Sequence, residues 1–407
     1  MQDLDAWLAY IEQIHAKPID MGLDRLRQVA NRLELPKLGK WVVSVAGTNG
    51  KGSSCRFLEV LALQQGLKVG RYSSPHFERF NERVCLQAQP VSDSLLVQAF
   101  ARVEQARAEI SLSYFEFTTL AAFVVFAEQQ LDVVILEVGL GGRLDAVNLV
   151  DADCAILVSV ALDHQDFLGD DLNGIAAEKI GIARPAAPLF IGETKALEVL
   201  ERAEQLTGSQ VYRKGMDFGC RDGQFFWPQG SCPAFDSQLP QENLPAVLAA
   251  WASSPWALEV SQELQQALAV ASLPGRMQTV RFQRASVLLD VAHNPHAAER
   301  LAGHLKNRPG PFAMVFSALA DKDIAGIVRP FADLDCSWHL LPLAGPRGLT
   351  VAELAQQVQM PTMHLYDNLA PALQSACQPG AQVVVFGSFM TVSEAMAWLN
   401  QDKISRA

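Results

Sequence analysis

The sequence predicts an α/β protein of two domains, the first larger than the second. The chain has 407 residues, which is too long for one average domain and suits two. Continuous apolar runs rich in Val, Ile and Leu recur along it with helical patterns between them, which is typical of parallel sheets covered by helices on both faces. A glycine-rich turn joins the first of these runs to a helix, as in phosphate-binding loops.

The N-terminal domain is predicted over residues 1–273, with a mostly parallel sheet. Its strands are the apolar runs at 41–47, 132–139, 154–161 and 188–192. A weaker, polar stretch containing Gly and Trp follows at 205–240, and helices are expected at 245–255 and 261–271. The Pro-Gly pair directly before Arg276 punctuates the chain and marks the domain boundary.

The C-terminal domain is predicted over residues 274–407. A second set of apolar runs lies at 286–295, 311–319, 336–345 and 382–389, again separated by helical patterns. This domain is therefore expected to be a smaller α/β unit with its own sheet.

Composition excludes several classes of protein. The hydrophobic content of 49%, the charged content of 19% and the net charge of −11 describe a globular protein without the basic tract of a nucleic-acid binder. Seven scattered cysteines without a C-x-x-C pair indicate reduced thiols rather than a disulfide framework or a zinc site. No apolar segment has the length of a membrane span and the N-terminus does not read as a signal peptide, so we expect a cytoplasmic protein.

The glycine-rich turn lies in the stretch SVAGTNGKGSSCRF at 44–57. Backbone N–H groups at the start of a helix bind phosphate oxygens because those donors lack partners and the helix dipole favours anions. Lys51 and Ser53 match the lysine and the metal-binding hydroxyl of a phosphate loop. The strict pattern G-x-x-x-x-G-K-[ST] is not met, because Val45 replaces its first glycine and Gly52 separates Lys51 from Ser53. The context nevertheless favours a phosphate site over an ordinary turn with an exposed lysine.

Two further polar residues follow predicted strands. Glu137 ends one apolar run, at the place of the acid that holds a nucleotide-bound Mg²⁺, although a solvated residue at a strand end is the alternative. His164 comes three residues after the run that ends at Ala161; a lone histidine is more often structural than a ligand. Because parallel strands end at one edge of a sheet, both residues are candidates for a site there.

Seven motifs in this order resemble the family of folylpolyglutamate synthases/dihydrofolate synthases, in its bacterial bifunctional form, within the Mur ligase superfamily. They are GTNGKGS (47–53), SSPHFERFNER (73–83), LEVGLGGRLDAVN (136–148), DHQDFLG (163–169), EKIGI (178–182), PGR (274–276) and DVAHNPHA (290–297). Each motif is modest alone, but together they span nearly the whole chain. The family also carries the same non-standard phosphate loop.

The resemblance implies an ATP-dependent amide ligase with a P-loop domain and a Rossmann-like C-terminal domain. ATP phosphorylates a carboxylate of dihydropteroate or of a folate's glutamyl tail, and the amino group of L-glutamate attacks the acyl phosphate. Phosphorylation makes the carboxylate oxygen a good leaving group, so positioning and charge neutralisation suffice and Cys55 is expected only to pack. The resemblance further implies two Mg²⁺ ions, K⁺ as a further cation, and a monomer that binds neither nucleic acid nor membrane.

Site residues follow from the resemblance position by position. ATP contacts are implied at Thr48, Asn49, Gly50, Lys51, Gly52, Ser53, Asn243, Arg276, Asp290 and His293. Metal ligands are implied at Ser53, Ser74, Glu137 and His164, and catalytic roles at Lys51, His164, Lys179 and Arg276. Pterin-side contacts are implied at Asp20, Met21, Gly22, Leu23, Tyr114, Phe115, Glu116, Phe117, Leu144, Asp145 and Ala146.

For some of these residues a plainer interpretation is also open. Lys179 matches a lysine that is carbamylated in the family, whereas the residues alone favour an exposed helix lysine beside Glu178. Phe115 and Phe117 are either flat walls for a pterin ring or ordinary core residues. Arg276 lies at the predicted boundary, where a hinge arginine contacts phosphate only after domain closure.

Three other functions compete with this hypothesis. A muramyl ligase shares the loop and the acyl-phosphate chemistry, but the loop at Gly47 leaves too few preceding residues for its UDP-sugar domain. A folate ligase restricted to polyglutamylation differs only on the pterin side. A P-loop ATPase or GTPase switch would use hydrolysis to move a partner, but the chain has no N-K-x-D motif for guanine.

Overall fold

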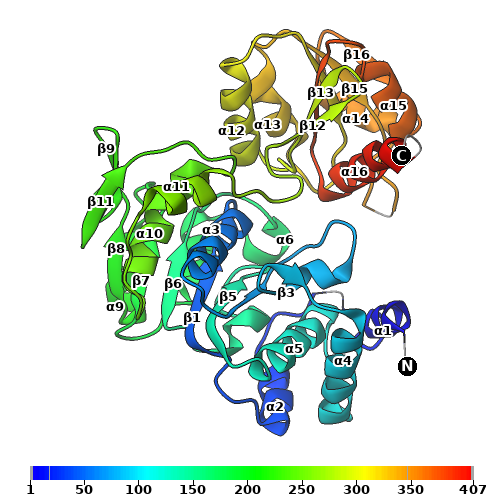
Figure 1. Ribbon diagram of the computed structural model, residues 1–407. Coiled ribbons are helices and arrows are strands. Elements are labelled where there is room, and N and C mark those ends of the chain that lie inside the picture. The colour runs from blue at the N-terminus through cyan, green and yellow to red at the C-terminus, as the bar shows by residue number, and fades with distance from the viewer. Residues whose placement is uncertain (1–2, 18, 346, 405–407) are drawn as a thin grey trace. The chain divides into compact units, whose positions relative to one another are not determined.

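The computed structural model describes residues 3–17, 19–345 and 347–404. The chain divides into two compact units, unit 1 over residues 1–271 and unit 2 over residues 272–407 (Figure 1). No helix in the part of the chain that the structure describes is long and apolar enough to cross a membrane.

Unit 1 contains an eight-stranded sheet in the order β4-β3-β2-β5-β1-β6-β7-β8. All neighbours pair in parallel except β2–β3 and β3–β4. The strands are β1 (Gly39–Ala46), β2 (Val69–Tyr72), β3 (Val84–Leu86), β4 (Gln89–Pro90), β5 (Leu131–Glu137), β6 (Cys154–Leu157), β7 (Pro188–Ile191) and β8 (Gln210–Arg213). The four predicted strands are β1, β5, β6 and β7, and the predicted mostly parallel α/β architecture is confirmed.

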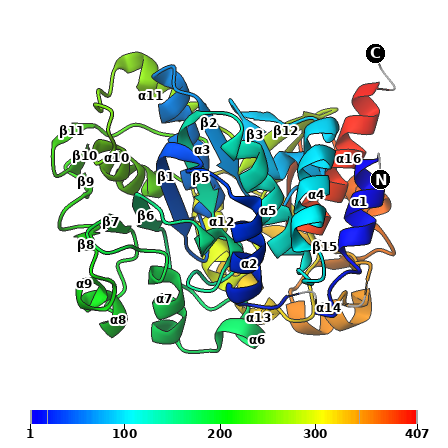
Figure 2. The ribbon, with the colours of Figure 1, turned by 90° about the horizontal axis from the view of Figure 1, so that it is seen from below.

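Helices cover both faces of this sheet. They are α1 (Leu4–Ile11), α2 (Asp24–Leu33), α3 (Lys51–Gln64), α4 (Asp93–Arg107), α5 (Tyr114–Ala127), α6 (Gln165–Leu168), α7 (Leu172–Ile180), α8 (Glu198–Glu201), α9 (Ala203–Thr207), α10 (Leu244–Ala252) and α11 (Gln262–Ala269), with 3-10 turns η1 (Phe80–Arg83), η2 (Ala146–Leu149) and η3 (Gln241–Asn243). Figure 2 shows α2, α4 and α5 next to one another; their buried side chains form one core with α1, α7 and one face of the strands. Helix α3 packs on strands β1, β2 and β5, and helix α10 packs on strands β6 and β7.

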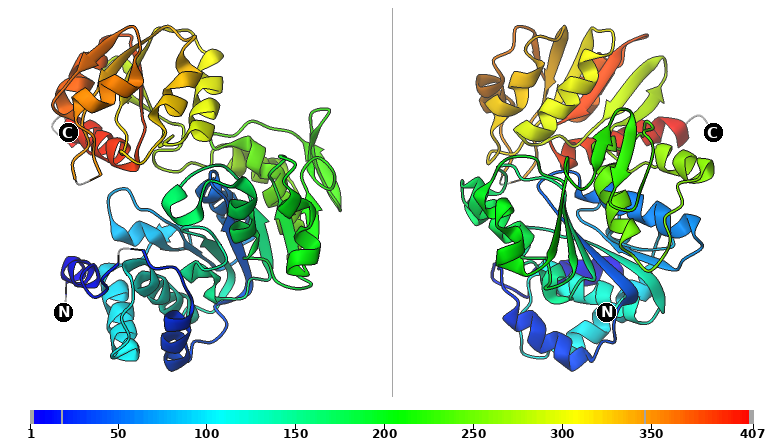
Figure 3. Two further views of the ribbon diagram at one scale, coloured as in Figure 1. Left: turned by 180° about the vertical axis from the view of Figure 1, so that it is seen from behind. Right: turned by 90° about the vertical axis from the view of Figure 1, so that its left-hand side faces the viewer.

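The stretch at 205–240, which we described as weak and polar, holds strands that the apolar pattern did not predict. After β8 it forms an antiparallel three-stranded sheet of β9 (Gly219–Arg221), β10 (Gln224–Trp227) and β11 (Gly230–Pro233). Figures 1 and 3 show this small sheet and α1 at opposite ends of unit 1. Helix α10 packs against β10 and β9.

Unit 2 is a six-stranded sheet in the order β12-β13-β17-β14-β15-β16, parallel except for β12. Its strands are β12 (Gln278–Phe282), β13 (Ala285–Leu289), β14 (Phe312–Phe316), β15 (Cys336–Leu340), β16 (Met363–Leu365) and β17 (Gln382–Phe386). Its helices are α12 (Pro295–Lys306), α13 (Ile324–Val328), α14 (Val351–Val358), α15 (Leu369–Ala376) and α16 (Phe389–Ile404), with the 3-10 turn η4 (Arg329–Phe331). A separate core of buried residues between 288 and 386 holds it together, so the expected Rossmann-like unit is present.

Candidate functional site

The strand order of unit 1 gathers the predicted polar residues at one edge of its sheet. Strand β1 lies between β5 and β6, and β2 lies beyond β5, all parallel. The 47–51 loop follows β1, Ser74 follows β2, and Ser159 follows β6. Glu137 is the last residue of β5. This carboxyl-terminal edge, where neighbouring strands lead to different faces, is where open α/β sheets bind ligands.

The 47–51 loop is held against the segment that follows β6. Thr48 donates its backbone N–H to the carbonyl of Ser159 (2.9 Å), and its hydroxyl contacts both the carbonyl and the amide of Ala161 (3.1 and 3.0 Å). The amide of Asn49 donates to Ser159 Oγ at 3.0 Å. Ser159 was not predicted from the sequence, because it lies inside the apolar run 154–161 and nothing local distinguishes it.

Lys51 is the first residue of α3 and folds back over this loop. Its Nζ donates to the carbonyls of Gly47 (2.9 Å) and Thr48 (3.3 Å). Gly50 caps the helix in the left-handed region with φ +85°, which a glycine adopts without strain. The result is a lysine and a helix N-terminus at one place, which is an anion-binding arrangement.

Asn243 reaches the same loop from η3. Its Nδ2 donates to the Gly50 carbonyl at 3.4 Å, although the two residues are far apart in the sequence. A Cβ built on Gly50 would lie 2.7 Å from that Nδ2, so a larger residue at this position would require Asn243 to move. The structure therefore brings the predicted Asn243 to the predicted phosphate loop.

The four predicted metal ligands differ in setting. Glu137 is buried at the end of β5, and one of its carboxylate oxygens accepts from the Ser74 amide at 3.4 Å. Ser53 is buried in the first turn of α3. His164 is exposed at the start of α6 with φ +52°. Among the described residues, no three or more His, Cys, Asp or Glu side chains are grouped so that they could hold a metal ion by themselves, so the predicted donor set consists of two hydroxyls, one carboxylate and one imidazole. That set fits Mg²⁺, which keeps waters and phosphate oxygens as its other ligands.

The burial of Lys179 contradicts the interpretation that it is an exposed helix lysine beside Glu178. Its side chain is only 4% exposed, on the last turn of α7, so it does not lie on a wet helix face. Glu178 instead binds Arg143 at 2.7 Å. Burial, and then the charge of Lys51, lower the pKa of Lys179 to about 7. Lys179 is thus a buried amine close to the phosphate loop.

The loop between β5 and η2 is a packing element as much as a candidate binding surface. The Arg143 amide donates to the Glu178 carbonyl at 2.7 Å, and a Cβ on Gly142 would lie 2.5 Å from that carbonyl. Asp145 is buried and accepts from the amides of Leu140 and Val147, and its burial raises its pKa to about 6. Asp145 and Ala146 are buried in this structure, which leaves Leu144 as the partly exposed residue of the three.

The aromatic residues predicted to contact the pterin differ in burial: Tyr114 and Phe115 are partly buried, whereas Phe117 is fully buried. Phe115 is partly buried, and its ring fills the space beside Gly139, 2.6 Å from a Cβ built there. Tyr114 is partly buried beneath the Arg83 guanidinium, and burial raises its pKa to about 12. Phe117 contradicts the flat-wall interpretation: its ring is fully buried against Trp7 and Phe100.

The remaining pterin-side residues lie on the segment before α2. Met21 and Gly22 are partly exposed, whereas Leu23 is buried. Asp20 contacts His15 Nε2 at 3.2 Å and forms ion pairs with Lys17 (3.6 Å) and Arg25 (2.5 Å). Glu116 is buried and pairs with Arg25, so its carboxylate is already engaged within the protein.

In unit 2 two of the three predicted ATP contacts, Arg276 and His293, lie at one aromatic ring, and the third, Asp290, supports the turn beside them. The Arg276 guanidinium lies 4.9 Å from the Phe389 ring centre, and the His293 ring lies 6.0 Å from it. Asp290 is buried after β13 and accepts from the amides of Met277 (2.9 Å) and Ala292 (3.0 Å). Asp290 thereby holds the turn that carries Arg276. Phe389 was not singled out in the sequence, since nothing local distinguishes it from a core residue.

The seven cysteines are all free. Cys55 is fully buried in α3, and burial raises its pKa well above the usual value. It is therefore a packing residue, as expected, and not a nucleophile.

Comparisons with known proteins cover nearly the whole chain. Residues 275–389 match the family "Mur ligase, glutamate ligase domain". The dihydrofolate synthase/folylpolyglutamate synthase of Escherichia coli is 43% identical over 97% of this chain and 94% of that protein. The enzyme of the same name from Haemophilus influenzae is 39% identical over 97% of each.

Solved structures agree with these relatives. Escherichia coli FolC in complex with DHPP and ADP superposes with a TM-score of 0.92 at 42% identity, over 98% of each chain. A Yersinia pestis bifunctional folylpolyglutamate synthase/dihydrofolate synthase, complexed with AMPPNP and a Mn ion, superposes with a TM-score of 0.91 at 40% identity, over 98% of each chain.

Proposed function

The chain belongs to the dihydrofolate synthase/folylpolyglutamate synthase family, and from this premise we propose how its residues carry out the reaction. It is an ATP-dependent ligase that joins L-glutamate to dihydropteroate, giving dihydrofolate, and to folyl-(poly)glutamates. The single observation in this chain that supports the assignment best is the 47–51 loop. In this loop the N-terminus of α3 and the Nζ of Lys51 lie together, and the neighbouring strand β5 ends at the buried Glu137.

The phosphate loop is proposed to bind the triphosphate of ATP. Gly50 and Gly52 supply backbone N–H groups, Thr48 and Asn49 hold the loop in place through their amide contacts with Ser159, and Asn243 holds the Gly50 carbonyl. Lys51 exchanges its contacts with the Gly47 and Thr48 carbonyls for phosphate oxygens, because an anion is the stronger partner for an ammonium group. The transferred phosphate converts the substrate carboxylate into an acyl phosphate, which the glutamate amine then attacks.

Two Mg²⁺ ions are proposed at Ser53, Ser74, Glu137 and His164, with K⁺ as a further cation. When bound, these cations offset the repulsion between the triphosphate and the substrate carboxylate. Glu137 supports the assignment, because its carboxylate is buried at the edge of the sheet and is met there by the Ser74 amide. His164 requires its exposed turn to close over the site, which makes it the most demanding member of the set.

Lys179 is proposed to be carbamylated. Its burial and its pKa of about 7 supply the neutral amine that the modification needs. A carbamate on Lys179 replaces a positive charge near Lys51 with a negative one, which suits a site that binds cations.

Folate binding is proposed at the segment 20–23, at Tyr114 and Phe115, and at Leu144. Arg276, Asp290 and His293 of unit 2 are proposed to contribute to the use of ATP and glutamate; the match of 275–389 to a glutamate ligase domain supports this. The protein is further proposed to act as a cytoplasmic monomer on small molecules, without nucleic acid or membrane.

A phosphate-release assay tests the proposed function. With dihydropteroate, ATP and L-glutamate together, phosphate and ADP are expected to form in equal amounts with dihydrofolate. Omitting glutamate or the pterin substrate is expected to stop turnover, because the acyl phosphate is productive only when it is trapped. Robust ATP turnover without either substrate would contradict the ligase assignment and indicate a P-loop switch.

A further inference from the structure

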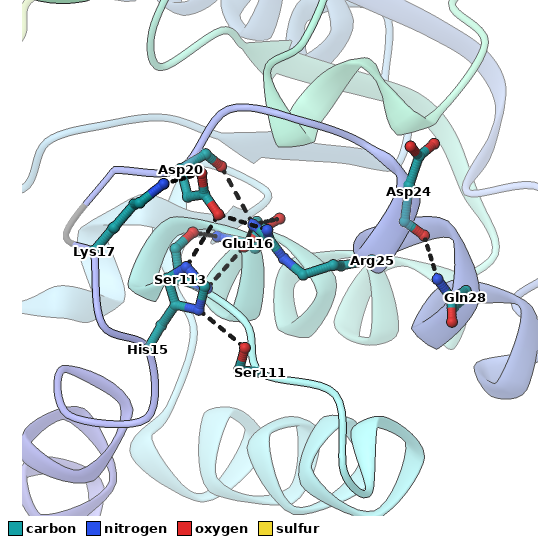
Figure 4. Close-up of polar contacts among 9 residues, drawn as sticks. All are labelled: His15, Lys17, Asp20, Asp24, Arg25, Gln28, Ser111, Ser113 and Glu116. Atoms are coloured by element: carbon teal, nitrogen blue, oxygen red, sulfur yellow. Dashed lines mark hydrogen bonds and ion pairs between the residues drawn. The ribbon is translucent and has the colours of Figure 1, made fainter.

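Arg25 joins two carboxylates that belong to different parts of the chain. Its Nη1 donates to Asp20 Oδ2 at 2.5 Å, and its Nη2 donates to both carboxylate oxygens of Glu116 at 3.0 and 3.1 Å (Figure 4). Asp20 precedes α2, Arg25 lies in the first turn of α2, and Glu116 lies in the first turn of α5. One guanidinium thus fastens the segment before α2 to the start of α5.

Both ends of this bridge are anchored further. Glu116 also accepts from the Ser113 amide at 2.7 Å, which completes the capping box of α5. Asp20 contacts His15 Nε2 at 3.2 Å, and His15 Nδ1 lies 3.0 Å from Ser111 Oγ. Figure 4 shows His15, Asp20, Arg25 and Glu116 converging between these segments. The positions of His15 and Asp20 are therefore set by polar contacts in which Arg25 is the cation shared by the two carboxylates.

The fastened elements reach the loop that follows Glu137. The methyl group of Met21, one residue after Asp20, lies 3.1 Å from a Cβ built on Gly141. Phe115, one residue before Glu116, occupies the space beside Gly139. The two side chains that flank the Arg25 bridge thus meet the same glycine-rich loop at the carboxyl-terminal edge of the sheet.

We propose that Arg25 is a positioning residue that sets the affinity for the pterin-bearing substrate by holding Met21 and Phe115 at this loop. The proposal rests on the proposed function. Without the guanidinium, the buried Glu116 carboxylate would lose its cationic partner, and Asp20 would keep, among the described residues, only the exposed Lys17 at 3.6 Å and His15 at 3.2 Å. The repulsion between the two carboxylates would then move Asp20 away from α5. Glutamate and the triphosphate bind through other residues in the proposed function, so their binding is expected to be unaffected.

The test compares Arg25→Met, Arg25→Lys and a matched control. The control is Arg32→Met, which removes a guanidinium two turns further along α2. Arg32 likewise connects α2 to another part of the chain, because it donates to the carbonyls of Ala106 and Arg107 at the end of α4 and to the Glu109 carboxylate. For each variant we would measure kcat, the KM of each substrate and the Kd of dihydropteroate by calorimetry. Arg25→Met is expected to raise the KM and Kd of dihydropteroate roughly 10-fold or more, because small displacements of positioning groups have effects of that order. The other parameters, and Arg32→Met, are expected to stay within about twofold of wild type.

A double variant separates positioning from direct contact. If Arg25 acts by neutralising the two carboxylates, Glu116→Gln combined with Arg25→Met is expected to be no worse for dihydropteroate binding than Arg25→Met alone, and Arg25→Lys is expected to be intermediate. An unchanged Kd for dihydropteroate in a folded Arg25→Met, or an equal loss in all parameters, would overturn the inference. Should Arg25→Met not fold, Arg25→Lys and Glu116→Gln take its place under the same criteria. Failure of wild type to bind dihydropteroate would instead contradict the proposed function itself.

Discussion

At the scale of single residues, Lys179 shows how burial changes the chemistry of a side chain. Burial, followed by the charge of Lys51, lowers its pKa from 10.5 to about 7. As an unmodified lysine it would bind fewer protons in the folded than in the unfolded state between about pH 7 and pH 10.5. Its burial would therefore destabilise the fold fully below about pH 7, and stability would rise with pH across that window. A carbamate replaces the ammonium group with an anion, whose charge Lys51 and the proposed cations would offset.

The first prediction concerns this modification. Lys179→Ala is expected to lose most ligase activity and to regain part of it with millimolar acetate or formate, because a short carboxylate occupies the place of the carbamate. The matched control is Lys40, an exposed lysine at the start of β1 that pairs with Asp132 of β5. Lys40→Ala is expected to remain active.

The pH dependence of the wild type checks the same assignment. Carbamylation needs the neutral amine, so labelling with ¹³C-bicarbonate is expected to be weaker at pH 6 than at pH 8, on either side of the pKa of about 7. The measurement is the carbamate signal in ¹³C NMR. Absence of that signal at pH 8, together with a fully active Lys179→Ala, would contradict carbamylation.

At the scale of secondary-structure elements, helix α3 is terminated by two glycines with different surroundings. Gly50 caps its N-terminus at φ +85°, and a Cβ there would lie 2.7 Å from Asn243 Nδ2 and 2.9 Å from Val158 Cγ1. Gly66 follows its C-terminus at φ +70°, with no atom within 4 Å of a Cβ. The two positions therefore share a left-handed backbone that would strain any residue other than glycine, but only Gly50 is confined by packing.

A second prediction uses this pair. Gly66→Ala is expected to lower the free energy of unfolding by about 1 kcal/mol, the cost of a left-handed non-glycine residue. Gly50→Ala is expected to lower it by more, because Asn243 and Val158 must also move. Only Gly50→Ala is expected to raise the Kd of ADP, since only there must the phosphate loop and Asn243 move. Chemical denaturation and calorimetry with ADP measure the two effects. Equal Kd values for both variants would show that the loop does not bind the nucleotide phosphates.

At the scale of the whole molecule, each unit contains its own hydrophobic core. A core of buried residues between 4 and 203 lies within unit 1, and another between 288 and 386 lies within unit 2. A unit with its own core is able to fold alone. The proposed ATP contacts are nevertheless distributed over both units, with Lys51 in the first and Arg276 in the second.

The third prediction follows from that distribution. Residues 1–273 expressed alone are expected to fold, with a cooperative unfolding transition, but not to ligate glutamate. Arg276→Ala in the full chain is expected to keep the fold of both units and to lose most activity, which separates the role of the arginine from that of the rest of unit 2. Full activity of the 1–273 fragment would mean that unit 2 serves another purpose.

Short and partly exposed strands were the part of the fold that the apolar pattern did not predict. Strand β12 alternates between exposed and less exposed residues, β16 has three residues at a sheet edge, and β2 carries Arg71. The guanidinium of Arg71 is nearly buried because it pairs with the fully buried Glu59 of α3. From sequence alone a charged residue is predicted to be exposed. Its burial becomes possible only when another element supplies a partner of opposite charge.

By itself the sequence determined the two sets of buried strands, the glycine turn before α3 and the residue types for phosphate and cation chemistry. These features are local, since a strand covered on both faces must be apolar throughout and a tight turn needs glycine. Only the tertiary structure decided which partners those residues have. It placed Asn243 on Gly50, paired Glu178 with Arg143, and buried Phe117 while leaving Phe115 beside Gly139. The physical reason is that strand order and helix packing, which join residues distant in the chain, set both the burial and the charge around each side chain.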